Sequence, residues 1–340
     1  MARLTQAIVN LTRLTSLSTR VLADIPFAAT AFVQRPPSYT VPAFVNLGVA
    51  GYFGGGQDGT NSLSGIDKIT FPADSKTTLS ATLTTARNLP TGMANSIVAG
   101  YFGGGDDGAN ISGIDKITFP ADARTTLSAT LTTARTQLAG MANSAVAGYF
   151  GGGYDSTYIS GIDKITFPAD TKTTLSAVLT TARSAEAGMA NSGVAGYFAG
   201  GEDSGGDISG IDKITFPADT KTTLSAVLTN ARRFTAGMAN SGVAGYIGGG
   251  FGGSRISGID KITFPADTKT TLSATLTTAR NLPSAMANSG VAGYFGGGVD
   301  TVLVDGIDKI TFAADTKTTL SATLTSPRNR MAGMANSGIL

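Results

Sequence analysis

The sequence predicts an all-β fold: a six-bladed β-propeller with four-stranded antiparallel blades, preceded by a short N-terminal anchoring segment. The main observation is a unit of 48 or 49 residues that recurs six times from about Gly48 to the C-terminus. Self-similarity at a fixed period of this length is typical of solenoids and propellers. The second observation is composition. With 45 Gly and only 14% charged residues, the chain favours short strands and tight turns over helices.

Two phrases mark every copy. The Asp of Gly-Ile-Asp-Lys-Ile-Thr-Phe stands at Asp67, Asp115, Asp163, Asp212, Asp260 and Asp308. The Tyr of Gly-Tyr-Phe/Ile-Gly/Ala-Gly stands at Tyr52, Tyr101, Tyr149, Tyr197, Tyr246 and Tyr294. A functional centre needs a residue that differs from its equivalents, so a sixfold ring of one residue indicates architecture. We expect each Asp to accept hydrogen bonds from backbone amides or from the repeated Arg (87, 135, 183, 232, 280, 328), and the Lys after it to be solvated.

One copy, from Arg87 to Arg135, illustrates the four strands of a blade. From the axis outward, the predicted strands are Gly92–Asn95, Val98–Phe102, Ile111–Phe119 and Thr125–Thr133. The first is small enough to line a central channel. Ile117 and Phe119 share one face of the third strand and should pack between blades, each contributing roughly 1.5–3 kcal/mol. Thr and Ser alternate along the fourth strand, which keeps its free edge solvated and discourages aggregation.

The chain holds two candidates for the innermost strand of the first blade. Residues 43–48 resemble that strand, but residues 333–338 are a better copy of it. We therefore expect the C-terminal copy to close the ring as a non-covalent clasp. The predicted domains are residues 1–42, an anchoring segment and connector, and residues 43–340, the propeller.

The repeat resembles the kelch repeat. Hydrophobic residues precede a double Gly, an aromatic residue follows, and an Arg stands before the innermost strand. Arg87 precedes Gly103 and Gly104 by the interval usual in that family, and Phe119 stands where the kelch Tyr is expected. The kelch Trp is missing, and the region of Thr126 and Leu127 takes its place. The resemblance implies a kelch-like propeller but no kelch partner.

The unit Gly-Tyr-Phe-Gly-Gly-Gly … Ile-Asp-Lys-Ile is also similar to the kelch-like repeats of tailed-phage virion proteins, particularly those of cyanophages, over about residues 43–340. Residues 2–9 resemble the short virion-attachment segments of some phage tail proteins. These resemblances imply a virion protein of the tail, made in the host cytoplasm. Residues 1–42 would dock it to tail or baseplate proteins, and a homo-oligomer such as a trimer stays open.

The first twenty residues carry three Arg and no acid. Their longest apolar run, residues 7–9, is too short for the core of a signal peptide, so none is predicted. An organelle transit peptide is the alternative interpretation of this composition.

Only two connections differ among the copies: the loop after the Gly run and the loop after the repeated Arg. In a four-stranded antiparallel blade these two emerge on the same face, and the nearly invariant Asn-Ser and Pro-Ala-Asp turns emerge on the other. We interpret the variable side as a binding face. The alternative is that exposed loops drift because nothing restrains them.

The variable loops mix acids and amides with aromatic rings. Planar polar groups bind pairs of hydroxyls and aromatic faces stack on sugar rings, so a host-surface glycan such as lipopolysaccharide is the expected ligand. The candidate ligand-binding residues are Asp58, Asn61, Asp106, Asp107, Tyr154, Asp155, Tyr158, Glu202, Asp203, Asp207, Arg233, Phe234, Phe251 and Arg255.

Composition excludes several functions. The chain has no Cys, His or Trp, which removes disulfides, Cys/His zinc sites and the Ser-His-Asp triad. A net charge of +2 predicts no nucleic-acid partner, and the lack of an eighteen-residue apolar run predicts no membrane insertion. No catalytic residue, metal or cofactor is predicted. Calcium binding by the acids of the variable loops stays open, because their spacing is not that of an EF-hand.

Together these observations and resemblances predict a non-enzymatic tail-fibre or receptor-binding adhesin of the virion, and two alternatives to it remain. A propeller glycosidase needs two carboxylates at a set separation, and the loops show acids but no such pair. A cellular kelch-like scaffold for protein–protein interaction would need an apolar patch in the variable loops, which are mostly polar.

Overall fold

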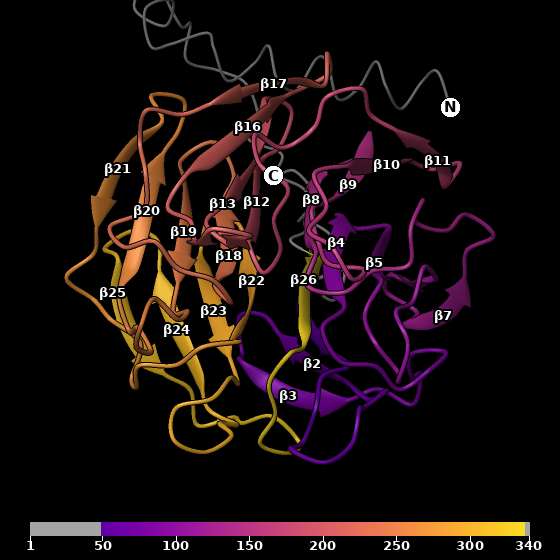
Figure 1. Cartoon of the computed structure of the whole chain (residues 1–340). Coiled ribbons are helices and arrows are strands. Elements are labelled where there is room, and N and C mark those ends of the chain that lie inside the picture. Colours follow the sequence, from indigo (N-terminus) through magenta and orange to yellow (C-terminus); the bar gives the residue numbers. More distant parts are fainter. Residues whose placement is uncertain (1–48, 337–340) are drawn as a thin grey trace, which may run out of the picture. The chain divides into compact units, whose positions relative to one another are not determined.

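Short strands follow one another along residues 49–336, which are the residues that the computed structural model describes. Four of them hydrogen-bond in antiparallel order to form each blade, and six such blades surround a central axis (Figure 1). The prediction of a six-bladed β-propeller is thereby confirmed. The predicted anchoring segment, residues 1–42, and residues 43–48 lie outside the described residues. Within 49–336, no helix has the length and hydrophobicity that a membrane crossing requires.

The two inner strands of each blade are rich in Gly and Ala, so they can approach the axis and each other closely. From blade 1 to blade 6, the innermost strands are β26 (Ala332–Asn336), β4 (Thr91–Asn95), β8 (Ala139–Asn143), β12 (Ala187–Asn191), β18 (Ala236–Asn240) and β22 (Ser284–Asn288). In the same order, the second strands are β1 (Ala50–Gly54), β5 (Ala99–Gly103), β9 (Ala147–Gly151), β13 (Ala195–Ala199), β19 (Ala244–Gly248) and β23 (Ala292–Gly296).

The third strand carries the Ile-Asp-Lys-Ile-Thr motif, and the fourth is the exposed outer edge. From blade 1 to blade 6, the third strands are β2 (Ile66–Thr70), β6 (Ile114–Thr118), β10 (Ile162–Thr166), β16 (Ile211–Thr215), β20 (Ile259–Thr263) and β24 (Ile307–Thr311). The fourth strands are β3 (Ser75–Thr78), β7 (Ala123–Thr126), β11 (Thr171–Thr174), β17 (Thr220–Thr223), β21 (Thr268–Thr271) and β25 (Thr316–Thr319). Blade 4 adds a small hairpin, β14 (Glu202–Asp203) and β15 (Gly206–Asp207).

The ring is closed by the C-terminal strand. β26 pairs antiparallel with β1, with Tyr52 opposite Met334. Each innermost strand also contacts the innermost strands of both neighbouring blades, and β26 lies between β22 and β4. The prediction that the C-terminal copy completes the first blade is confirmed.

The predicted outer strands were too long. The third strand of blade 2 spans Ile114–Thr118, and the fourth ends at Thr126 instead of Thr133. The alternation after Thr126 does not mark a strand, because the segment turns back along the blade. The Leu127 amide donates to the Ile114 carbonyl (2.9 Å) and the Leu131 amide to the Ser112 carbonyl (2.9 Å). Leu131 is buried, whereas all four residues of β7 are exposed, as predicted for the edge.

The hydrophobic core lies between adjacent blades. Ile117 and Phe119 of blade 2 pack with Tyr52 and Met334 of blade 1, and the Phe119 ring stacks on the Tyr52 ring with centroids 5.2 Å apart. The same stacking recurs between every pair of neighbouring blades. The predicted position of Ile117 and Phe119 is confirmed.

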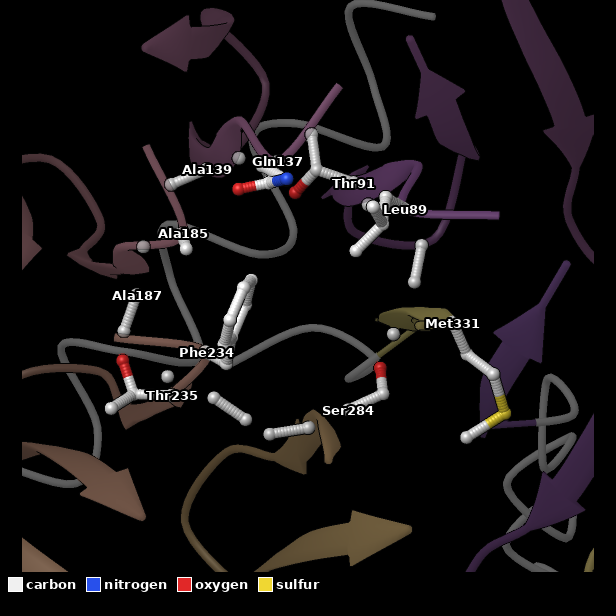
Figure 2. Close-up of a pocket in the computed structure, with 18 of the residues that line it drawn as sticks. Leu89, Thr91, Gln137, Ala139, Ala185, Ala187, Phe234, Thr235, Ser284 and Met331 are labelled. Atoms are coloured by element: carbon white, nitrogen blue, oxygen red, sulfur yellow. The ribbon is translucent and has the colours of Figure 1, made fainter. Parts of the chain in front are cut away.

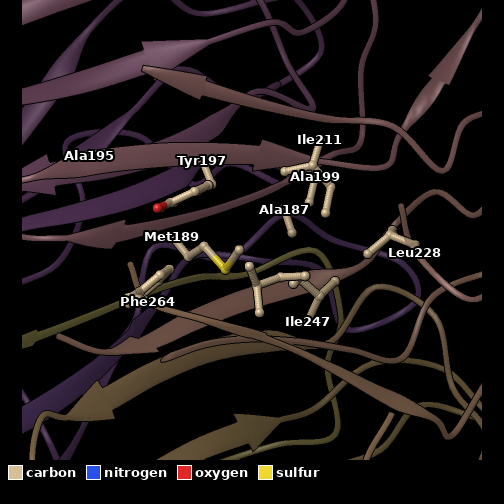
Figure 3. Close-up of a cluster of buried hydrophobic side chains, with 10 residues drawn as sticks. Ala187, Met189, Ala195, Tyr197, Ala199, Ile211, Leu228, Ile247 and Phe264 are labelled. Carbon is tan, nitrogen blue, oxygen red and sulfur yellow. The ribbon is translucent and has the colours of Figure 1, made fainter. Parts of the chain in front are cut away.

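One core layer differs from the others in two compensating residues. In five blades the second strand ends in Gly, and in all five that Gly lies against a Phe ring of the next blade: a Cβ on Gly103 would lie 2.7 Å from the Phe150 ring. Blade 4 has Ala199 at this place, and blade 5 has Ile247 instead of Phe. The two share one cluster (Figure 3). The extra methyl group therefore occupies space that a Phe ring would need.

A buried ion pair links each blade to the next. Asp115 accepts hydrogen bonds from the Arg87 guanidinium, the Thr84 amide (2.9 Å) and the Thr84 hydroxyl (2.5 Å), and Arg87 and Asp115 are both almost fully buried. The same Arg–Asp pair recurs in all six junctions. The structural role predicted for these Asp residues is confirmed. Removing one partner would leave the other charge buried and unpaired, at a cost of about 3–5 kcal/mol.

The same pair closes the ring between blade 6 and blade 1. Asp67 accepts hydrogen bonds from Arg328 (2.6 Å) and from the amide of Thr325 (2.9 Å). The pKa of Asp67 lies below its ordinary value: burial raises it, but the hydrogen bonds from Thr325 and the charge of Arg328 outweigh burial. Burial also lowers the pKa of Arg328, against the attraction of Asp67.

A second link explains why the Asp of the Pro-Ala-Asp turn recurs in all six blades, although the Pro is Ala313 in blade 6. The Tyr52 hydroxyl donates to Asp122 of the next blade (2.8 Å), and Lys68 forms an ion pair with the same carboxylate (2.6 Å). Burial raises the pKa of Tyr52, and Asp122 adds to the shift. The prediction that the Lys residues are solvated was wrong: Lys68 is 14% exposed and lies over the Tyr52 ring. Lys68 on β2 lies directly opposite Tyr52 on the adjacent strand β1. The face of the sheet that carries both side chains packs against the turn of the next blade that contains Asp122.

Candidate ligand-binding face

The two variable connections of each blade meet on one face. In blade 3, Tyr154 bridges to Thr136, with backbone hydrogen bonds of 2.9 and 3.1 Å, and also to Tyr158 at the other end of its loop. The nearly invariant turns meet at the opposite ends of the strands, where the Phe119 amide donates to the Val98 carbonyl (2.8 Å). The predicted sorting of variable loops and invariant turns onto opposite faces is confirmed.

This bridging gives each blade a frame of three backbone positions: the last and first residues of the loop after the Gly run, and the residue after the repeated Arg. We call it the loop frame. From blade 1 to blade 6, it holds Ser62-Gln57-Asn329, Asn110-Asp106-Asn88, Tyr158-Tyr154-Thr136, Asp207-Glu202-Ser184, Arg255-Phe251-Arg233 and Leu303-Val299-Asn281. One backbone arrangement thus presents different side chains around the face: mainly amides in blades 1 and 2, aromatic rings in blade 3, acids in blade 4, Arg and Phe in blade 5, and two apolar residues with an Asn in blade 6.

Blades 4 and 5 are joined by Arg233. Its Nη1 atom lies 3.0 Å from Glu202 Oε2 and 2.9 Å from Asp207 Oδ1. Its guanidinium also lies over the rings of Phe251 (5.2 Å to the centroid) and Phe234 (5.6 Å). The cation is therefore held between two carboxylates and two aromatic faces. Burial raises the pKa of Glu202, and the charge of Arg233 opposes the shift.

A pair of tyrosines in blade 3 continues this surface. The rings of Tyr154 and Tyr158 meet edge to face with centroids 5.4 Å apart, and Tyr154 is 36% exposed. The pKa of Tyr158 is raised by burial and further by the negative charge of Glu202, which places the tyrosine pair beside the acids of blade 4. The structure thus brings together the predicted residues of blades 3–5.

Other predicted acids hold their own loops. Asp58 accepts hydrogen bonds from the amides of Thr60 (3.2 Å) and Asn61 (2.9 Å), which lower its pKa. Carboxylates in the corresponding loops of blades 2–4 accept hydrogen bonds from amides two residues further on: Asp106 from Gly108, Asp107 from Ala109, Asp155 from Thr157 and Asp203 from Gly205. Asp58 and Asn61 belong to blade 1, and Asp106 and Asp107 belong to blade 2, whose loop reaches blade 3 through a hydrogen bond from the Asn110 side-chain amide to the Tyr154 carbonyl (3.4 Å).

A second set of residues lines the axis on the same face. They follow the repeated Arg by two positions and have φ between 53° and 59°: Leu89, Gln137, Ala185, Phe234, Leu282 and Arg330. We call them the axial ring. Four backbone hydrogen bonds join its members across blades: from the amide of Leu89 to Arg330, of Ala185 to Gln137, of Phe234 to Ala185 and of Leu282 to Phe234.

The axial ring surrounds a funnel of about 110 Å³, into which Phe234 projects (Figure 2). Hydroxyl groups of Thr91, Thr235 and Ser284 also line it. Only Phe234 of this ring was predicted as a candidate. The variation of the loop after the repeated Arg was visible in the sequence. The sequence did not show that the second residue of this loop takes the same left-handed conformation in every copy and reaches the axis.

Glu186, another residue that the predictions missed, lines the same funnel. It is 5% exposed, and within residues 49–336 neither of its carboxyl oxygens has a hydrogen-bond partner of good geometry. Burial raises the pKa of Glu186 to about 8, against the positive charges of Arg183 and Arg135. Burial therefore favours the neutral, protonated form of this side chain.

Among the described residues, no three acidic side chains are grouped as a metal-binding cluster. No protein-family model matches the chain, and no curated protein matches it. The evidence for the propeller and for the geometry of its variable face is therefore the structure itself. The kelch and phage resemblances remain expectations from the sequence.

Proposed function

We propose that this chain is a non-enzymatic component of a tailed-phage virion, a tail-fibre or receptor-binding adhesin, whose variable face binds a host-surface glycan such as lipopolysaccharide. The observation that carries the proposal is the loop frame: one conserved backbone presents aromatic, acidic and cationic side chains next to one another in blades 3–5. Exposed aromatic faces stack on sugar rings, while carboxylate and guanidinium groups bind adjacent hydroxyls in pairs.

The direction of the chain supports attachment from the other face. The Phe71 amide donates to the Val49 carbonyl (2.9 Å), as the Phe119 amide does to Val98, so Val49 lies beside the first Pro-Ala-Asp turn. The chain therefore joins the propeller on the invariant face. Several copies on one virion would strengthen a weak individual site through avidity.

Binding without catalysis is proposed because the acids of this face already have structural partners. Glu202 and Asp207 share one guanidinium, and Asp58 and Asp155 close their own loops. A protein-binding scaffold is the second candidate. It is favoured by the apolar loop frame of blade 6 and by Val302 beside it, which is 67% exposed.

A loop exchange tests the proposal. Residues 154–158 and 106–110 have the same length and the same frame, so Tyr-Asp-Ser-Thr-Tyr can be replaced by Asp-Asp-Gly-Ala-Asn. Residues 251–255 are exchanged in the same way. We expect each exchange to abolish binding of the purified protein to an array of bacterial lipopolysaccharides, with a melting temperature that stays within a few degrees because the core is untouched.

Exchange of residues 299–303 in blade 6 is the matched control and should preserve lipopolysaccharide binding. Binding that survives both test exchanges, or that disappears only with the blade 6 exchange, would count against a glycan site in blades 3–5. The second outcome would favour the scaffold.

A further inference from the structure

The six residues of the axial ring have a left-handed backbone, which disfavours residues with a side chain, and yet each position carries a side chain and these side chains differ among the blades. A left-handed backbone costs a residue with a side chain about 1–2 kcal/mol, and Gly or Asn avoids most of this. None of the six ring residues is Gly or Asn. The Pro-Ala-Asp turn, by contrast, places Asp at its left-handed position in every blade. Outliers of this kind cluster at ligand sites, so the ring residues are candidates for binding.

Blade order fixes which ring members face each other. Arg330 and Ala185 are three blades apart and so stand on opposite sides of the axis, as do Leu89 and Phe234. Leu89 and Leu282 are the neighbours of Arg330. The funnel therefore has one cationic side, flanked by apolar groups and opposite the small side chain of Ala185.

The charge of Arg330 has no acidic counterpart. Its Nη1 donates to Gln57 Oε1 (2.7 Å), its Nε is buried without a partner, and within residues 49–336 no carboxylate forms an ion pair with it. Glu186, the other ionisable group that lines the funnel, is buried, and this burial favours its neutral form. The funnel is thus positively charged, and a guanidinium binds a carboxylate better than it binds neutral acceptors.

We infer that the axial funnel binds an acidic sugar residue of the glycan, with its carboxylate on Arg330 and its ring against Phe234. The inference depends on the proposed glycan-binding function. A volume of about 110 Å³ admits one end of a sugar ring but no branched oligosaccharide. The hydroxyl groups of Thr91, Thr235 and Ser284 supply hydrogen-bond partners deeper in the funnel.

The test is to titrate the full chain with glucuronate as the probe and to detect binding by ligand-observed NMR. Glucose and acetate are titrated in the same way for comparison. We expect glucuronate to bind the wild type, and glucose and acetate to bind more weakly by roughly tenfold or more. Arg330→Gln should lower glucuronate affinity to the level of glucose. Gln and Leu occur at equivalent ring positions, Gln137 and Leu89, so Arg330→Gln and Arg330→Leu should both fold.

Lys221→Gln is the control, because Lys221 is a cation of β17, the outer strand of blade 4, and does not line the funnel. It should leave glucuronate binding unchanged. The inference is overturned if the wild type does not bind glucuronate, if glucose or acetate binds equally well, or if Arg330→Gln binds normally. When the wild type binds neutral glycans but not glucuronate, the axial assignment alone fails. When it binds no glycan, the proposed function fails with it.

Discussion

At Glu186 the chain holds a carboxyl group where equivalent positions hold Pro90, Leu138, Thr235, Pro283 and Met331. Among the described residues neither of its carboxyl oxygens has a hydrogen-bond partner, and the nearby Arg135 and Arg183 are bound to their own Asp residues. Burial of an unpaired carboxylate is costly, so the group keeps its proton instead. Its pKa of about 8 compares with an ordinary value of 4.5.

This difference predicts the pH dependence of stability. Between about pH 4.5 and 8 the folded chain holds a proton on Glu186 that the unfolded chain has lost. The free energy of unfolding should therefore fall as pH rises, by about 1.4 kcal/mol per unit from this group. Glu186→Leu, which copies Leu138, should remove this slope and be the more stable protein at pH 8.

Denaturant unfolding of both proteins at pH 5, 6, 7 and 8 measures the difference. The chain has no His, so few other groups titrate in this range. Parallel pH profiles for the wild type and Glu186→Leu would show that Glu186 ionises normally.

At the scale of elements, neighbouring strands are fitted to each other across the blade junctions. The pair of Ala199 on β13 and Ile247 on β19 shows this, since both depart from the repeat where they share a cluster. Ile247→Phe alone should be destabilising by about 1–3 kcal/mol, because the ring meets the Ala199 methyl group. Ala199→Gly together with Ile247→Phe recreates the packing of the other junctions and should recover most of that loss.

Chemical denaturation of the wild type, both single variants and the double variant gives the coupling free energy of this pair. We expect a favourable coupling of about 1–3 kcal/mol. Additive effects of the two substitutions would contradict the fit between these strands.

At the scale of the whole molecule, stability depends on a closed ring. Met334 on β26 is buried between blades 1 and 2, as Met141 on β8 is buried between blades 3 and 4. If β26 is docked as firmly as the other innermost strands, Met334→Ala and Met141→Ala should each cost about 2–5 kcal/mol and differ little. Equilibrium unfolding of the two variants is the measurement. A Met334→Ala variant as stable as the wild type would mean that the ring opens at its C-terminal clasp.

The repeat by itself determined the number of blades, their strand order and the sorting of variable loops onto one face. These follow from local patterns that occur six times, such as the small residues of β4 and the turn residues around Asp122. The Asp–Arg pairing was also predictable, because a residue repeated in every copy has a structural role.

Only the tertiary structure decided what arises between blades. Asp122 binds Tyr52 and Lys68 of another copy, so the invariance of its turn has a structural cause, and the Lys that was expected in water is partly buried. The axial ring and the isolated Glu186 also emerged only from the closed disc. The physical reason is that periodicity specifies a blade and its own hydrogen bonds, whereas burial, pairing of charges and the meeting of loops at the axis depend on where six blades come together.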